Sequence, residues 1–257
     1  MSNLQSQLIL QWFSCFVIGI TVGSTAAGII WTSHKILDVV YGAATDALGR
    51  DEYGLAFTIY MGNGLVCAGI AATLTSLLEP LSGASGIPDV KSYLNGNFYP
   101  GLLRFRTLFC RVVGLTLSTA SGLYVGKEGP VVHIGAIIAS GVTQGRSKLA
   151  HCSAAVMRPL RSDALKVSFI SIGAATGVAA AFGAPIGGVL FAIEEASSQW
   201  SHELTWMSFF TAAIASFTIR FTLTGYNDVP QNGFMDFPKS EHEYEVHIQL
   251  CYIAFSI

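Results

Sequence analysis

A set of long apolar runs limits the possible folds of this chain more than any other feature. Five stretches approach or exceed the roughly 20 residues that an α-helix needs to cross a bilayer. They lie around Leu8–Trp31, Leu55–Leu78, Leu108–Val125, Val167–Ile193 and Leu204–Leu223. Two further apolar pieces, Pro130–Val142 and Gln249–Ile257, are too short to span a membrane unaided. The pattern predicts an all-α, polytopic transmembrane bundle.

The composition supports a membrane environment. Hydrophobic residues make up 51% of the 257 residues and charged residues only 12%, with a mean hydropathy of +0.52. Soluble domains typically carry about 25% charged residues. The alternative, a soluble all-helical protein with a large core, does not easily account for five such runs in one small chain. The formal net charge of −2 indicates no nucleic-acid partner, and the expected partner is a lipid bilayer.

Small residues are frequent inside the apolar runs, and polar connections between the runs are few. The chain has 27 glycines, many of them placed among alanines and serines, as in the segment 173–188. Such residues let transmembrane helices approach one another closely, which predicts a compact bundle. The most polar connections are Asp38–Tyr53, Lys91–Arg106, Gln144–Lys166 and Asn227–Glu245.

Three segments rich in glycine and proline interrupt the apolar pattern, at residues 83–90, 126–133 and 182–189. Each is followed by residues that can begin a helix, and a proline in the first helical turn loses no hydrogen bond. In lipid, such breaks are tolerated only where the freed backbone is buried in protein or lines a watery cavity. They therefore predict broken re-entrant helices around a binding site near the bilayer midplane.

The chemistry of a helix start favours an anion at such a site. Its free N–H groups and the positive end of its dipole carry roughly half an elementary charge. Several starts aimed at one point form an anion site without any full positive charge. The long stem of Lys127 can carry its ammonium group away from that point. A phosphate-binding loop would need a different glycine spacing and a preceding strand, which the segment 126–130 lacks.

The motifs at these breaks resemble those of the CLC family of chloride channels and chloride/proton antiporters. The matching segments read Ala-Ser-Gly-Ile-Pro at 84–88 and Gly-Lys-Glu-Gly-Pro at 126–130, followed by the stretch from Gly183 to Glu195. The resemblance runs from about residue 10 to the C-terminus. In the family the first motif begins with glycine, where this chain has Ala84. The residues of the motifs resemble those of the eukaryotic intracellular-membrane branch more than those of the bacterial members.

The resemblance implies a chloride-binding segment formed by Ser85, Gly86, Ile87 and Pro88. Ser85 matches the serine whose hydroxyl group coordinates the central chloride ion. Relatives with proline at this position resemble nitrate-preferring members. The alternative role for Ser85 is that of a helix N-cap, which needs no ion.

The resemblance also assigns a role to Glu128. This residue matches the external gating glutamate, which competes with chloride for the anion site and carries protons when it is neutral. Gly126, Lys127, Gly129 and Pro130 complete the filter motif around it. A carboxyl group at lipid depth is costly and by default marks a functional position. The alternative is an ion pair between Glu128 and its neighbour Lys127.

Glu195 bears on the choice between a channel and an exchanger. In the family, the second position of the Glu194-Glu195 pair is the internal proton glutamate of antiporters, and channels place an apolar residue there. The sequence is therefore interpreted as that of a chloride/proton exchanger, with desolvation raising the pKa of Glu195. A solvated glutamate pair at a helix end remains an alternative. So do a chloride-selective channel of the same fold and a truncated, non-transporting membrane subunit.

We find no sign of enzymatic chemistry in the sequence. The five cysteines and six histidines show no metal-ligand spacing, and no catalytic elbow motif is present. His133, directly after the filter motif, is expected to pack or to form a hydrogen bond. No cofactor is expected, and chloride is the expected bound ion.

The resemblance extends to the organisation of the whole protein. Residues 1–257 are expected to form a partial CLC transmembrane domain, comprising the first inverted repeat and the start of the second. The later motifs of the family and its cytosolic CBS domains do not occur in this sequence. The resemblance further implies a homodimer, with segments around 185–223 in its surface. It places the protein in an intracellular membrane, such as an endosomal, lysosomal or vacuolar one.

Overall fold

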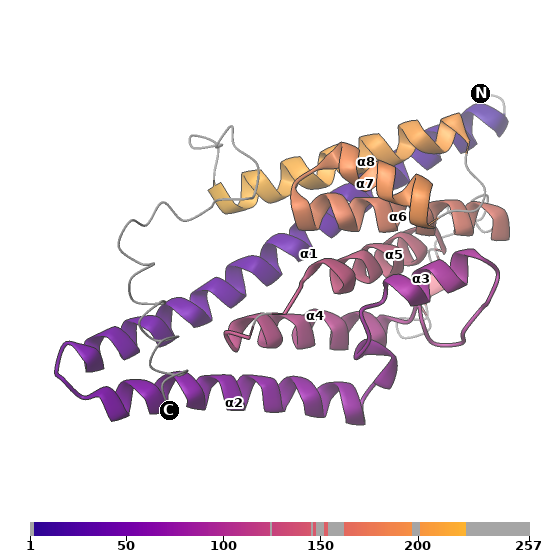
Figure 1. The fold of residues 1–257 in the computed structure, drawn as a ribbon. Helices are drawn as coiled ribbons and strands as arrows, with labels where there is room; N and C mark the ends of the chain where they lie inside the picture. The colour runs from indigo at the N-terminus through magenta and orange to yellow at the C-terminus, as the bar shows by residue number, and fades with distance from the viewer. Residues whose placement is uncertain are drawn as a thin grey trace.

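The chain folds into a bundle of helices of very different lengths (Figure 1). The computed structural model describes residues 3–123, 125–144, 146–147, 152–153, 162–196 and 201–224. The α-helices are α1 (Asn3–Leu48), α2 (Tyr53–Leu77), α3 (Ile87–Leu94), α4 (Phe105–Ala120), α5 (Glu128–Gln144), α6 (Asp163–Phe182), α7 (Pro185–Phe191) and α8 (His202–Thr224). A short 3-10 helix covers Pro80–Ser82, and a π-helix covers Ala192–Ala196. Strands β1 (Arg146–Ser147) and β2 (Cys152–Ser153) form one small antiparallel pair.

Four of these helices are long and apolar enough to cross a membrane. They cover Gln5–Leu48, Tyr53–Leu77, Asp163–Phe182 and His202–Leu223. Large apolar side chains on α2, including Phe57, Leu65 and Leu77, are exposed, as expected of a surface that faces lipid. The prediction of an all-α, polytopic transmembrane bundle is confirmed.

The bounds of two predicted runs were wrong. The first run continues as helix to Leu48, so the connection to α2 is only residues 49–52 instead of Asp38–Tyr53. The polar residues in this part do not end the helix, because no proline interrupts it. The third run is shorter as a helix than as a pattern. Its helix, α4, ends at Ala120, and Gly122, with φ of 75°, turns the chain while apolar residues continue.

The three predicted breaks are confirmed, because a helix begins at each of them. These helices are α3, α5 and α7. Pro88 and Pro185 occupy the first turns of α3 and α7, where no backbone hydrogen bond is lost. Gly183, in the left-handed conformation with φ of 67°, ends α6 and so divides the predicted run Val167–Ile193. The apolar piece Gln249–Ile257 lies outside the described residues.

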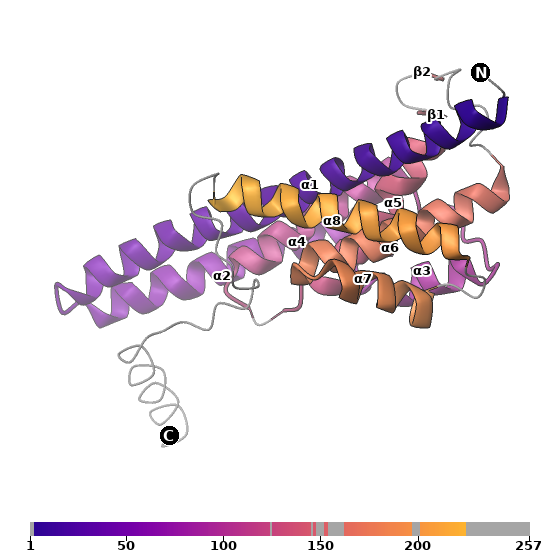
Figure 2. The same cartoon turned by 90° about the horizontal axis from the view of Figure 1, so that it is seen from above.

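The helices pack around α5 and α6, which make the most extensive contact in the bundle (Figure 1). Helices α1 and α8 run side by side along one flank, as Figure 2 shows from above. Helix α2 packs on α4 at the other flank, and the short α3 lies against α5 and α6. One apolar core joins α1, α5, α6 and α8, and a second joins α3 to α5 and α6. The starts of α3 and α5 are thereby held by the same core.

Glycines allow the backbones of α5 and α6 to touch. A Cβ atom at Gly135 would collide with the carbonyl oxygen of Gly173, and a Cβ atom at Gly173 would collide with that of Gly135. A Cβ atom at Gly177 would lie 2.6 Å from the carbonyl oxygen of Val131. Since these oxygens belong to the backbone, they cannot move aside cheaply. The compact packing expected from the small residues is confirmed at this contact.

We predict that Gly135→Val forces α5 and α6 apart and lowers the free energy of unfolding by about 1–3 kcal/mol, the usual cost of overpacking. Gly141→Val is the matched control, because Gly141 lies on the same helix and nothing is within 4 Å of its Cβ position. Both changes alter the intrinsic helix propensity by the same amount, so the difference between their stabilities reports packing. Denaturant titration of the purified variants in detergent measures this difference in the free energy of unfolding. Equal stability of the two variants would contradict the prediction.

Candidate anion site

The start of α3 depends on a glycine. Gly86 is the N-cap residue of α3 and has a left-handed backbone with φ of 88°. A Cβ atom there would lie 2.7 Å from Cβ of His133 and 2.8 Å from Nη1 of Arg111. Both the backbone conformation and the lack of space therefore exclude any side chain at position 86. Pro88 follows in the first helical turn.

The two filter motifs, which are far apart in the chain, meet directly. A Cβ atom at Gly129, in the first turn of α5, would collide with the hydroxyl oxygen of Ser85, and the carbonyl oxygen of Ser85 is 2.9 Å from the same point. Because position 129 has no side chain, the start of α5 can lie against the segment that precedes α3. The predicted convergence of two helix starts is therefore present in the structure.

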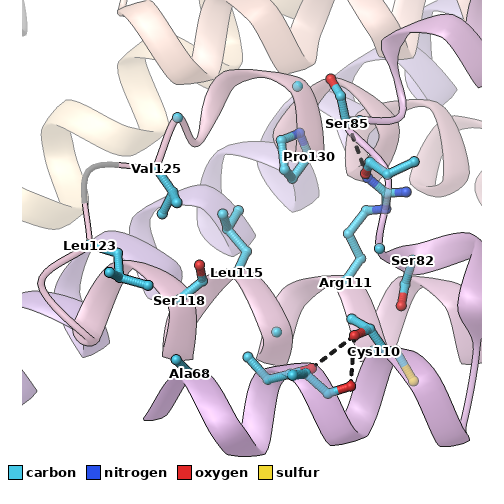
Figure 3. Close-up of a pocket in the computed structure, with 18 of the residues that line it drawn as sticks. Ala68, Ser82, Ser85, Cys110, Arg111, Leu115, Ser118, Leu123, Val125 and Pro130 are labelled. Atoms are coloured by element: carbon cyan, nitrogen blue, oxygen red, sulfur yellow. Dashed lines mark hydrogen bonds between the residues drawn. The ribbon is translucent and has the colours of Figure 1, made fainter. Parts of the chain in front are cut away.

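A cavity of about 520 Å³ lies at this meeting point (Figure 3). The motif residues that line it are Ala84, Ser85, Gly126, Glu128, Gly129 and Pro130. Residues of α2 and α4 also line it, among them Ala68, Cys110, Leu115 and Ser118. The cavity thus joins the two motifs to a wall of mostly small and apolar residues, which also carries the polar side chains of Arg111 and Ser118.

The other predicted site residues do not line this cavity. Gly86 is buried, and Ile87 and Pro88 belong to the first turn of α3. Lys127 is also absent from the lining. Glu195 lies at a separate place, next to α3.

The structure does not support the alternative roles of Ser85 and Glu128. Gly86, and not Ser85, is the N-cap residue of α3, and no side chain caps this helix. Within the described part of the chain, the one salt bridge joins Lys91 and Glu195, so Glu128 does not pair with Lys127. Instead, the carboxyl group of Glu128 folds back over Gly126, 2.5 Å from where a Cβ atom at that residue would lie.

Arg111 is a site residue that the sequence reasoning missed. It lies inside the apolar run Leu108–Val125 and is only 2% exposed. Its Nη1 atom donates to the carbonyl oxygens of Ala84 at 2.8 Å and Ser85 at 3.1 Å, and its Nη2 atom donates to that of Leu81 at 2.9 Å. An ionisable residue within an apolar run was the signal that could have identified it.

His133 has the packing role that the sequence predicted. It is fully buried, and its Nε2 atom is 3.0 Å from the carbonyl oxygen of Leu102. Its Cβ atom closes the space beside Gly86. His133 therefore connects the first turns of α5 to the residues around α3.

The environment of Glu195 differs from the expected one. Glu195 lies in the π-helix Ala192–Ala196, outside the four candidate spans, and about half of its side chain is exposed. Its Oε2 atom accepts a hydrogen bond from Nζ of Lys91 at 2.8 Å. This hydrogen bond and the charge of Lys91 hold the pKa of Glu195 below its usual value. The prediction that desolvation raises this pKa was wrong, because the carboxylate is exposed and lies beside an ammonium group.

Helix α3 connects the cavity at Ser85 to the salt bridge at Glu195. Ser85 lies just before its first turn, and Lys91, the partner of Glu195, lies in its last turn. Glu195 also lies close to Ile87 of α3 and to Val132 of α5. A change at Glu195 would therefore act on the same two helices that carry the filter motifs.

The part of the chain that the structure describes offers no other candidate chemistry. Among these residues, no group of three or more His, Cys, Asp or Glu side chains could hold a metal ion. Cys15, Cys67 and Cys110 are buried free thiols, in keeping with a packing role. Cys251 lies outside the described residues.

Comparison with known proteins agrees with this architecture. The family model described as voltage gated chloride channel matches residues 64–257. The H(+)/Cl(-) exchange transporter 7 of Bos taurus is 37% identical over 97% of this chain and 32% of its own length. Chloride channel protein C of Dictyostelium discoideum is 41% identical over 86% of this chain and 29% of its own length. The chain thus spans about a third of the length of these curated relatives.

The fold matches solved structures as well. The crystal structure of a eukaryotic CLC transporter superposes with a TM-score of 0.74 at 26% identity, over 84% of this chain and 39% of the other. The filter motifs at 84–88 and 126–130, the broken helices that follow them and the match of the family model lead to the same assignment. The chain belongs to the voltage-gated chloride channel (CLC) family of membrane proteins.

Proposed function

We propose that this chain contributes the anion site of a membrane transporter that exchanges chloride for protons. The observation that carries this proposal is the convergence of two broken helix starts, at Ser85 and Glu128, on one cavity. Each start supplies free N–H groups and a positive dipole end, which favour an anion. A halide that is held mainly by such partial charges binds weakly enough to leave again, as transport requires.

In this proposal Ser85 is a chloride ligand and Glu128 is the gate. The side chain of Ser85 does not cap α3, so its hydroxyl group is available to a ligand. The carboxyl group of Glu128 lines the same cavity and, when ionised, competes with chloride for the positive end of α5. When it is protonated, the competition ends and a proton is carried.

Exchange, rather than passive conduction, is favoured by the acidic residue at position 195. A titratable group beside α3 and α5 gives protons a binding point that an apolar residue could not provide. The bovine relative, which is similar over 97% of this chain, is named an H(+)/Cl(-) exchange transporter. We therefore assign the internal proton transfer to Glu195.

A chloride-selective channel of the same fold is the second candidate, and one observation favours it. Glu195 is exposed and paired with Lys91, which keeps its carboxyl group ionised and opposes proton uptake. In a channel, the pair would serve only to fasten the π-helix to α3. The Dictyostelium relative is named a chloride channel protein.

The resemblance to the family also supports proposals for the whole protein. We propose that residues 1–257 form the first inverted repeat of the CLC transmembrane domain and the start of the second. The complete protein would be a homodimer in an intracellular membrane. It would transport chloride and protons without a cofactor and without enzymatic chemistry.

We predict that Glu195→Ala reduces proton movement to background while chloride flux persists. A chimaera in which this chain replaces the matching segment of the bovine transporter supplies the remainder of the protein for a flux assay. Chloride and proton fluxes are measured in the same proteoliposomes. Glu194→Ala is the matched control and should keep proton coupling, since we assign it a structural role. If Glu195→Ala still moves protons against a chloride gradient, the exchanger assignment is wrong.

We predict that Ser85→Pro shifts anion preference from chloride toward nitrate. Proline removes both the side-chain hydroxyl group and a backbone donor at the start of α3. Reversal potentials or flux ratios in mixed anions, measured in the same chimaera, report the preference. Ser118→Ala is the control, because Ser118 lines the cavity but belongs to neither filter motif. An unchanged chloride preference in Ser85→Pro would argue against the proposed role of Ser85.

We predict that Lys91→Gln raises the pKa of Glu195 toward its usual value. Because Lys91 lowers this pKa in the folded chain, the pair adds stability at neutral pH and loses it as the pH falls through the pKa. Infrared or NMR titration of the glutamate carboxylates in the purified chain measures the change. Lys127→Gln, which removes a lysine that does not pair with Glu195, should leave the titration unchanged. An unchanged titration in Lys91→Gln would show that the pair does not form in solution.

A further inference from the structure

We propose that Arg111 is the fixed positive charge of the anion site and the residue that orients the backbone of the chloride-binding segment. This inference rests on the proposed function, because it assumes that the cavity at Ser85 and Glu128 receives an anion. It adds to that site a full charge, whereas the two helix starts supply only partial charges.

The first argument concerns the charge of Arg111. Arg111 lines the cavity together with Ser85 and Glu128 while remaining 2% exposed (Figure 3). Its Nη1 and Nη2 atoms donate to the neutral carbonyl groups of Leu81, Ala84 and Ser85. Among the described residues no carboxylate lies within 4 Å of it, since the one salt bridge is formed elsewhere. Buried charges are normally paired, so an unpaired guanidinium beside a cavity favours an anion within it.

Asp89 is the carboxylate that acts on this charge. It lies in the first turn of α3, and its charge interacts with that of Arg111 without forming an ion pair within 4 Å. The proposal therefore makes opposite predictions for the two residues. Loss of Arg111 should weaken anion binding, and loss of the charge on Asp89 should strengthen it.

The second argument concerns the direction of two peptide groups. In a planar trans peptide, the C=O and the following N–H point in opposite directions. Arg111 holds the carbonyl oxygens of Ala84 and Ser85, so the N–H groups of Ser85 and Gly86 point away from Arg111. The negative ends of both peptide dipoles are thereby occupied by the guanidinium. The positive ends remain for an anion, which is why the loop can act as a donor site.

The third argument concerns geometry. The Nη1 and Nη2 atoms of a planar guanidinium reach Leu81, Ala84 and Ser85 at once, and so fix the segment between the 3-10 helix and α3. The ammonium group of lysine keeps the charge but cannot reproduce this fork. Arg111→Lys therefore separates the charge of Arg111 from its positioning role, and Arg111→Gln removes both.

The experiment measures the thermal unfolding of the purified 257-residue chain in detergent as chloride replaces gluconate at constant ionic strength. An ion that binds only the folded state raises the melting temperature with its concentration. We expect a chloride-dependent rise for the unaltered chain and a rise at least twofold smaller for Arg111→Gln. Arg111→Lys should melt lower in gluconate yet keep most of the chloride-dependent rise. Asp89→Asn should show a larger rise than the unaltered chain.

Arg106→Gln is the matched control. Arg106 is an exposed arginine on the same helix, and its loss should leave the chloride dependence unchanged. Equal chloride dependence in Arg111→Gln and the unaltered chain would overturn the inference while leaving the proposed transport intact. The inference would also be overturned if Arg111→Lys and Arg111→Gln lost the same part of the chloride-dependent rise in melting temperature. A smaller rise in Asp89→Asn than in the unaltered chain would overturn it too. Absence of any chloride effect in the unaltered chain would also overturn it, and the flux assay on the chimaera then decides separately whether chloride is transported.

Discussion

The contact between the first turn of α5 and the segment before α3 is the constraint on which the site depends. Gly129 lies directly against Ser85, and Gly86 lies against His133 and Arg111, with no space for a side chain at either glycine. A methyl group at either position would have to push backbone or buried groups aside. These two glycines thus bring two helix starts, which belong to different parts of the sequence, to one cavity.

The electrostatics of the site follow from this contact. Helix starts in a membrane present donors that lipid cannot satisfy, and they persist only where protein or a cavity covers them. Here the carbonyl groups before α3 are held by Arg111, so the donors of the same peptides remain for a ligand. In the proposed function, this arrangement attracts an anion through helix dipoles and one buried charge. Glu128, which lines the same cavity, is the proposed source of the competing negative charge.

The fold was largely predictable from the sequence, because lipid leaves few options. Apolar runs must become helices in a bilayer, and the glycine and proline breaks at 83–90, 126–133 and 182–189 mark where new helices begin. Helix ends were less predictable where no such break occurs. Helix α1 continues to Leu48 through polar residues, and α4 ends before its apolar run does. Ser85 and Glu128 became candidates because the motifs around them resemble those of the CLC family, and Glu128 also because a carboxyl group is unexpected within apolar surroundings.

The sequence by itself determined the helical membrane fold, the positions of the breaks and the motifs at 84–88 and 126–130 that resemble those of the CLC family. These are properties of residue type and spacing, which act locally along the chain. Only the tertiary structure decided which groups touch. It brought Arg111 onto the carbonyl groups before α3, and it placed Lys91 next to Glu195. Both contacts join residues from different parts of the chain. The distance between two helices depends on how they pack, which a local sequence pattern does not predict.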